Sequence, residues 1–173
     1  MSKTAQAFSD HKKEKSTADL QNEYLTFQLA EEVFATHIKN VKEIIEHSEC
    51  TAIPSVPDFF RGILDLRGRA IPVIDLNVRF NHTPIIVSKR TCIIIVELEI
   101  DDQTMEMGLM IDAVKEVVEL PKSQIEAVPS FGHRINTQFM EGIAKINQKF
   151  VVILDLNHVL PTKEIQEIAF PHP

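Results

Sequence analysis

The sequence predicts an all-β protein made of two similar modules, each a small barrel of about five short strands. The first observation is an internal repeat: RGILDLRGRAIPVIDLN, which begins at Arg61, is matched 80 positions later by EGIAKINQKFVVILDLN, which begins at Glu141. In the same order, VKEIIE at Val41 recurs as VKEVVE at Val114. The second observation is that apolar runs are short and closely spaced, and closing such strands into barrels removes exposed sheet edges. We therefore predict one module at residues 23–80 and another at residues 81–160.

The elements of the first module follow from its apolar pattern. YLTFQL at Tyr24 alternates between apolar and polar residues, as in a half-buried strand. VFATHI at Val33 predicts a second strand, whereas NVKEIIEH at Asn40 fits either a strand or a helical turn. FFRGILDLRGRAIPVIDL at Phe59 predicts two strands around a tight connection. The second module repeats this series, beginning with TCIIIVELEI at Thr91.

Two pairs of residues occupy the tight connections. Arg67 and Gly68 form the first, where glycine can supply the positive φ of a hairpin turn. Asn147 and Gln148 are their counterparts, and asparagine tolerates the same conformation. Pro72 cannot donate a hydrogen bond to a neighbouring strand, so its strand is expected to lie at an edge or to carry a bulge.

The two ends of the chain differ from the modules in composition. Residues 1–22 are polar and poor in aliphatic side chains, so we expect a disordered leader. PTKEIQEI at Pro161 predicts a short helix, followed by a tail, within residues 161–173. Neither a signal peptide nor an apolar run long enough to span a membrane is evident, which predicts a soluble, cytosolic protein.

Composition and motifs exclude several classes of function. A net charge of −7 and the absence of tryptophan argue against nucleic acid as the main partner. The five glycines form neither a dinucleotide fingerprint nor a phosphate-binding loop, and the seven histidines and two cysteines lack the spacing of a zinc site. We therefore expect no catalytic residues, no metal and no cofactor, and hence no enzyme.

Three charged residues nevertheless invite a functional interpretation. Asp75 and Asp155 occupy equivalent places after a strand; either they form an acid–base pair or each caps free backbone amides, and one copy per module favours the cap. Arg67 has no basic counterpart, because Asn147 stands at the matching position. It is either an exposed turn residue paired with Glu43 or a contact residue for a partner.

The order of these motifs resembles the CheW family of chemotaxis coupling proteins, from about Glu23 to Leu160. RGILDLRGRAIPVIDLNVRF carries the strongest likeness, supported by IKNVKEIIE, AIPSVPDFFRG and GLMIDAVKEVVEL. Two departures stand out: Asp65 replaces the usual Asn before Leu-Arg-Gly, and Ala35 replaces a common Gly.

The resemblance implies two SH3-like five-stranded β-barrels packed around a shared core, with short helical turns. It also implies a cytoplasmic, non-enzymatic scaffold that is recruited to membrane-associated chemoreceptor arrays without touching the membrane itself. Its partners would be the cytoplasmic tip of methyl-accepting chemotaxis receptors and the regulatory domain of the histidine kinase CheA, in a two-component system. Carried over by motif, the receptor-binding residues are Val41, Glu43, Gly62 and Arg67.

Two alternatives stay open from the sequence. Within the family, an adaptor of a pilus-based twitching-motility pathway would carry the same motifs. Outside it, the paired barrels would bind a small ligand.

Overall fold

The computed structural model describes residues 3–14, 20–80, 82–128 and 137–160. The described chain is dominated by strands arranged in two sheets, which confirms the predicted all-β class. Its elements, in chain order, are α1 (Lys3–Glu14), β1 (Glu23–Leu29), β2 (Glu32–His37), η1 (Ile38–Asn40), β3 (Val41–Glu46), β4 (Phe60–Leu66), β5 (Arg69–Asp75), α2 (Leu76–Arg79), β6 (Cys92–Ile100), β7 (Gln103–Ile111), β8 (Ala113–Glu119), η2 (Lys122–Gln124), β9 (Ile125–Glu126), η4 (Thr137–Phe139), β10 (Met140–Ile146), β11 (Lys149–Leu154) and α3 (Leu156–Val159). The ambiguous segment at Val41 is thus a strand, and the predicted C-terminal helix lies outside the described residues.

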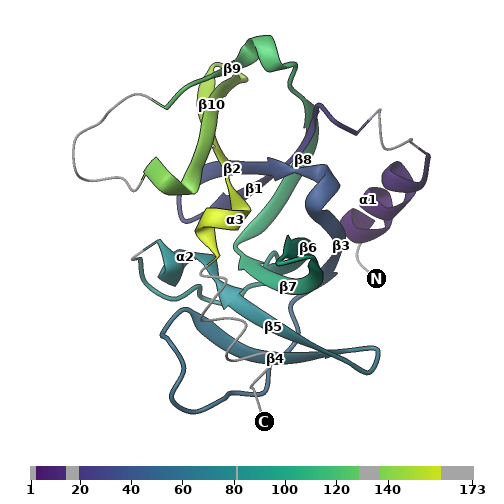
Figure 1. Cartoon of the computed structure of the whole chain (residues 1–173), viewed down its shortest axis with the longest axis vertical. Helices are drawn as coiled ribbons and strands as arrows, with labels where there is room; N and C mark the ends of the chain where they lie inside the picture. Colours follow the sequence, from purple (N-terminus) through teal and green to yellow (C-terminus); the bar gives the residue numbers. More distant parts are fainter. Residues whose placement is uncertain (1–2, 15–19, 81, 129–136, 161–173) are drawn as a thin grey trace.

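The two sheets do not follow the two modules. One sheet has the order β8-β1-β2-β11-β10-β9 and the other has the order β3-β6-β7-β5-β4. Each sheet therefore takes a hairpin, β1–β2 or β6–β7, from one repeat and its remaining strands from the other (Figure 1). The boundary near residue 80 separates two repeats in the sequence, but the repeats exchange their first hairpins in space.

The exchange preserves a common register. The parallel pairing of Val73 with Gly108 in one sheet matches that of Ile153 with Ala35 in the other. Both sheets also carry a bulge at the start of the strand that contains the repeated glycine, β4 or β10. The two repeats are therefore related position by position across the sheets.

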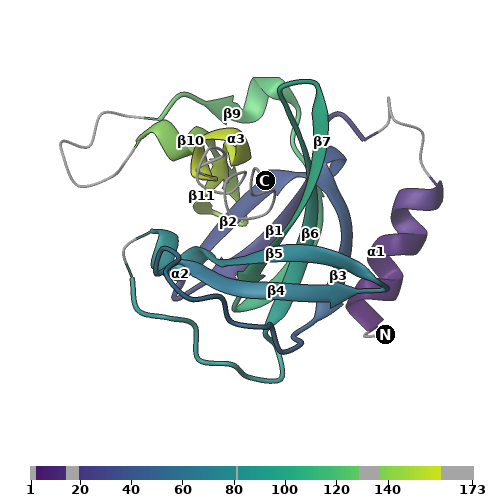
Figure 2. The same cartoon turned by 60° about the horizontal axis from the view of Figure 1, so that its bottom comes forward.

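One apolar core joins the two sheets. Its largest cluster contains buried residues from strands of both, including Phe27, Ile74, Ile94 and Leu154. A second contact lies where the repeats meet, near α2 and α3 (Figure 2): Arg79 donates to the Val159 carbonyl oxygen at 2.7 Å. The two units therefore pack on a shared core, as the resemblance implied.

The N-terminal segment is not disordered throughout, contrary to expectation. Residues Lys3–Glu14 form α1, which lies against β3 in both Figure 1 and Figure 2. Ala5 and Phe8, one turn apart, are 1% and 4% exposed and join the main core cluster. Lys12 donates to the Val41 carbonyl oxygen, and burial lowers the pKa of this lysine despite the opposing charge of Glu97. Docking on β3 stabilises a helix that its own sequence barely favours.

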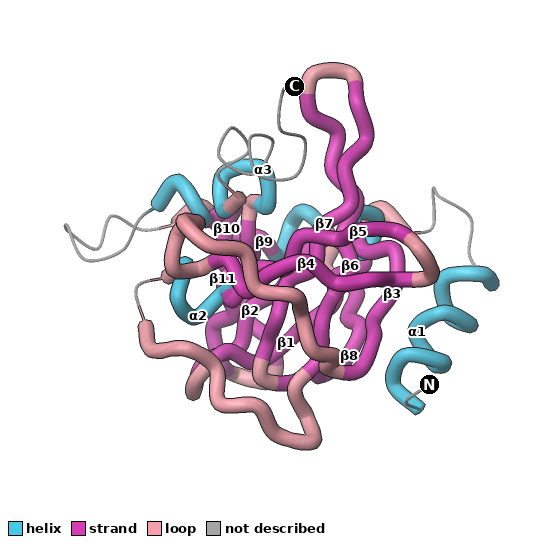
Figure 3. The backbone as a smooth tube through the Cα atoms, turned by 90° about the horizontal axis from the view of Figure 1, so that it is seen from below, coloured by secondary structure: helices cyan, strands magenta, loops and turns pink. Residues whose placement is uncertain are grey.

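The hairpins have the turns that the sequence predicts. Arg67 and Gly68 have φ values of +53° and +85°, and Asn147 and Gln148 have values of +50° and +67°. The long β6–β7 hairpin turns in the same way at Asp101 and Asp102, and it projects beyond the rest of the molecule (Figure 3). The strand of Pro72 is not an edge strand, but its pairing with β7 begins only at Val73, so the proline lies outside that ladder.

Candidate functional site

The tip of the β4–β5 hairpin holds Arg67 away from the core. Gly68 donates its backbone N–H to Asp65 Oδ1 at 2.9 Å, so the aspartate that departs from the family pattern closes the turn. The positive φ of Arg67 is uncommon for a residue with a Cβ atom. Its side chain is 60% exposed, so the turn presents a guanidinium group to solvent.

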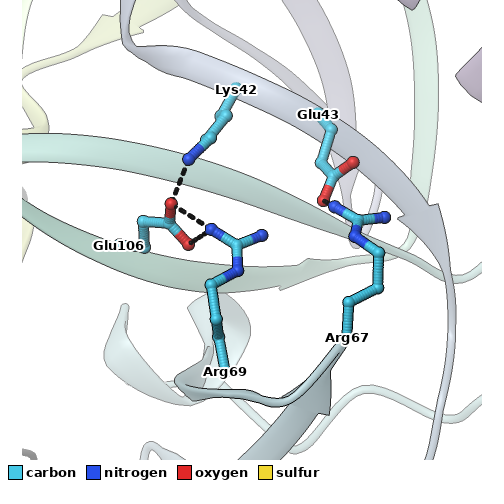
Figure 4. Close-up of polar contacts among 5 residues, drawn as sticks. All are labelled: Lys42, Glu43, Arg67, Arg69 and Glu106. Atoms are coloured by element: carbon cyan, nitrogen blue, oxygen red, sulfur yellow. Dashed lines mark hydrogen bonds and ion pairs between the residues drawn. The ribbon is translucent and has the colours of Figure 1, made fainter.

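Arg67 and Glu43 form an ion pair, which is the pairing that the sequence suggested. Arg67 Nη2, at the hairpin tip, lies 2.6 Å from Glu43 Oε1 on strand β3 (Figure 4). The Glu43 side chain is only 13% exposed, whereas the arginine is largely free to be reached by a partner. The pair therefore fixes one face of the guanidinium group and leaves its other donors available.

A second ion cluster, which was not predicted from the sequence, lies beside the first. Arg69 Nη1 contacts both carboxylate oxygens of Glu106, at 2.5 and 2.7 Å, and Lys42 donates to the same carboxylate (Figure 4). Burial alone would raise the pKa of the Glu106 carboxyl, but the hydrogen bonds and charges of Lys42 and Arg69 outweigh it and hold the pKa below its ordinary value. Three strands, β3, β5 and β7, thus meet in one charged surface.

The other two expected contact residues lie inside the fold. Val41 is fully buried. Gly62 has a φ of +140°, and a Cβ atom there would lie 2.3 Å from the Thr51 carbonyl oxygen. Neither residue therefore presents a side chain to solvent, and the charged side chains at the surface above them are Arg67, Lys42 and Arg69, with Glu43 partly buried beneath Arg67.

The two repeated aspartates cap backbone amides, as their positions predicted. Asp75 is fully buried and accepts hydrogen bonds from the backbone N–H groups of Asn77, Val78 and Ile85 at 2.9, 3.3 and 2.9 Å. Asp155 accepts one from Asn157 at 3.1 Å and contacts His158 Nδ1 at 2.8 Å.

Other reactive side chains in the described part do not converge. Cys50 and Cys92 are free thiols, and burial raises the pKa of each. No group of three metal-ligating side chains occurs within the described residues. Among the same residues, no helix has the length and apolar character needed to span a membrane.

Comparisons with known proteins point to one family. The family model described as the CheW-like domain matches residues 23–164. The chemotaxis protein CheW of Klebsiella aerogenes is 28% identical over 143 residues, covering 83% of this chain and 84% of that protein. That of Bacillus subtilis is 29% identical over 147 residues, covering 85% and 91%. The crystal structure of the scaffolding protein TtCheW from Thermoanaerobacter tengcongensis superposes with a TM-score of 0.70 at 40% identity, covering 79% of this chain and 85% of that one.

Proposed function

This chain belongs to the CheW family, and from that premise we propose that it is a scaffold that couples chemoreceptors to the histidine kinase CheA in chemosensory signalling. The observation that carries the proposal is the family match, which spans both repeats and the charged surface on β3, β5 and β7. A coupler of this kind does no chemistry of its own. It binds two partners, the receptor and the kinase. It shifts the kinase between two conformational states by binding one state more tightly than the other.

The receptor contact is assigned to the exposed end of the β4–β5 hairpin. Arg67 supports this assignment because its guanidinium group is exposed and held in one orientation by Glu43. Arginine is enriched among residues that dominate binding energy, since its planar group makes several directed hydrogen bonds. Val41 and Gly62 support the same surface from beneath, through the bulges of β3 and β4. The regulatory domain of CheA binds elsewhere on the molecule, and the chain acts in the cytoplasm, at receptor arrays.

Kinase activity in the presence of receptor tests the coupling directly. Phosphorylation of CheA from labelled ATP is measured with a receptor cytoplasmic fragment, with and without this protein. The proposal predicts activation that requires both the receptor fragment and this protein. If CheA and the fragment are each shown to be folded and competent, and adding this protein changes nothing, coupling is excluded.

Reversing the charge at the hairpin tip tests the receptor surface. Arg67→Glu removes the exposed guanidinium group and places a second carboxylate beside Glu43, so we expect affinity for the receptor fragment to fall by about 2 kcal/mol or more. Calorimetric titration of the fragment measures the change. Arg90→Glu is the matched control, because Arg90 is an exposed arginine outside the charged surface. An unchanged affinity for Arg67→Glu would remove this residue from the receptor site.

A further inference from the structure

Helix α1 lies beside the seam between the two sheets. Among the described strands, β3 ends one sheet and β8 ends the other. These two strands are equivalent copies of the repeat, with the sequences VKEIIE and VKEVVE. The helix packs chiefly on β3 and faces β8 across an open pocket of about 240 Å³, which both strands and the helix line. One helix thus lies between two equivalent strands and does not fill the space between them.

The first-repeat side of this seam is covered more fully than the second. Val41 and Ile44 on β3 are 0% and 1% exposed. Their counterparts 73 positions later, Val114 and Val117 on β8, are only partly buried and line the pocket. Phe8 of the helix borders this pocket together with Ile44. Helix α1 therefore adds a cover to β3 that β8 lacks.

The contacts that hold α1 in place lie along one side of the helix. Ala5 and Phe8 are its buried apolar side chains among the described residues. His11 Nε2 lies 2.6 Å from Glu23 Oε2, on a carboxylate side chain that is 4% exposed. A helix of 12 residues is marginal by itself in water, so its stability depends on this docking. Segments with few buried apolar contacts open locally at a small cost in free energy, and α1 therefore exchanges between a docked and a released state.

The last turn of α1 reaches the strand that is assigned to the receptor. Lys12 donates to the carbonyl oxygen of Val41, one of the expected receptor-binding residues. Glu43, which holds the exposed guanidinium group of Arg67, lies two positions further along β3. The tip of the β4–β5 hairpin and α1 lie at the same side of the molecule (Figure 1, Figure 2 and Figure 3). A partner that binds at Arg67 and along β3 therefore meets the helix.

We propose that α1 is an autoinhibitory helix, which covers part of the receptor-binding surface and is displaced when the receptor binds. On the proposed function, on which this inference rests, the receptor tip takes the place of α1 beside β3. The helix stays attached through residues 15–22, so it competes as an intramolecular ligand at an effective concentration that the chain sets. The apparent affinity for the receptor is then the intrinsic affinity reduced by the fraction of molecules whose helix is released.

Two opposite changes in α1 test the proposal through binding of the receptor cytoplasmic fragment. Phe8→Ser removes the large buried anchor and releases the helix, so we expect the affinity to rise about fivefold or more. Ala7→Leu places a larger apolar side chain in the open pocket beside Val114 and Val117. The leucine holds the helix more firmly, so we expect the affinity to fall about threefold or more. Calorimetric titration measures both changes, and urea unfolding shows whether each variant keeps its folded core.

Hydrogen exchange read by mass spectrometry follows the helix in the wild-type protein. Saturating receptor fragment should speed amide exchange in residues 3–14, whereas a receptor that binds onto α1 would slow it. Phe150→Ser is the matched control, because it makes the same substitution at a phenylalanine that is 63% exposed on β11, outside the seam. This control should bind the receptor fragment as the wild type does.

The outcomes separate the inference from the proposed function. Slower exchange in residues 3–14 on binding overturns the autoinhibition, as does a folded Phe8→Ser variant that binds the receptor fragment no better than the wild type. If neither the wild-type protein nor Phe8→Ser binds the fragment, the proposed function itself fails. That result differs from equal binding by both, which overturns the autoinhibition alone.

Discussion

The two hairpin ends, β4–β5 and β10–β11, share one backbone design and differ in how their charges are satisfied. In the sheet that contains β4 and β5, Glu43 pairs with Arg67, and Glu106 of the exchanged strand β7 joins Lys42 to Arg69. In the sheet that contains β10 and β11, Val33 and Asn147 take the places of Glu106 and Arg67, and both line a pocket. Duplication has therefore kept the turns, bulges and register in both copies while altering the charged side chains on their surface.

Removing each capping aspartate tests the structural part of this comparison. Asp75→Ala leaves three backbone N–H groups without their acceptor in a fully buried site, so we expect a loss of about 4 kcal/mol in the free energy of unfolding. Asp155→Ala removes one N–H contact at a partly exposed site and should cost about 1 kcal/mol. Urea denaturation measures both. Equal losses would show that burial does not distinguish the two caps.

Alanine substitution of the two repeated glycines compares the stability of the two bulges. Gly62→Ala places a Cβ atom 2.3 Å from a backbone oxygen at a φ of +140°, so we expect a loss of about 3 kcal/mol. Gly142→Ala meets the Ile125 side chain at 2.8 Å and the Glu126 oxygen at 2.9 Å on the two-residue strand β9, without the positive φ. Its loss should be smaller, about 1–2 kcal/mol. Thermal unfolding of the two variants ranks them, and a larger loss for Gly142→Ala would contradict this reasoning.

The smallest expected effect is a pH dependence that arises in the sheet of β3, β5 and β7. The pKa of Glu106 is lowered in the folded protein, so its contribution to stability is present above about pH 4.5, its ordinary pKa, and is lost as the pH falls through the lower, folded value. Water reaches Lys42 and Arg69, so the contribution should be about 1 kcal/mol or less.

Glu106→Gln tests this contribution by removing the titrating group while keeping its size. Denaturant unfolding between about pH 3 and pH 6 should show a shallower loss of stability in acid for this variant than for the wild type. Glu32→Gln, at an exposed carboxylate beside Val33, is the matched control in the other sheet. A profile identical to that of the wild type for Glu106→Gln would mean that the cluster adds nothing to stability.

The repeats, the turns and the capping aspartates were predictable because each depends on short segments of sequence. The exchange of hairpins was not predictable, because an alternating apolar pattern shows which face of a strand is buried but not which strand pairs with it. Glu106 was missed for the same reason: it reaches Lys42 and Arg69 only because β7 lies in the sheet of β3 and β5. Helix α1 was missed because Ala5 and Phe8 are its only buried apolar anchors among the described side chains.

Co-sedimentation of CheA with vesicles that carry the receptor cytoplasmic fragment tests the coupling and the receptor surface in one measurement. With the wild-type protein, CheA and this protein should both sediment. Arg67→Glu should leave this protein and CheA in the supernatant, whereas the control Arg90→Glu should sediment with CheA as the wild type does. If Arg67→Glu brings down as much of this protein and of CheA as the wild type, the exposed end of the β4–β5 hairpin does not bind the receptor.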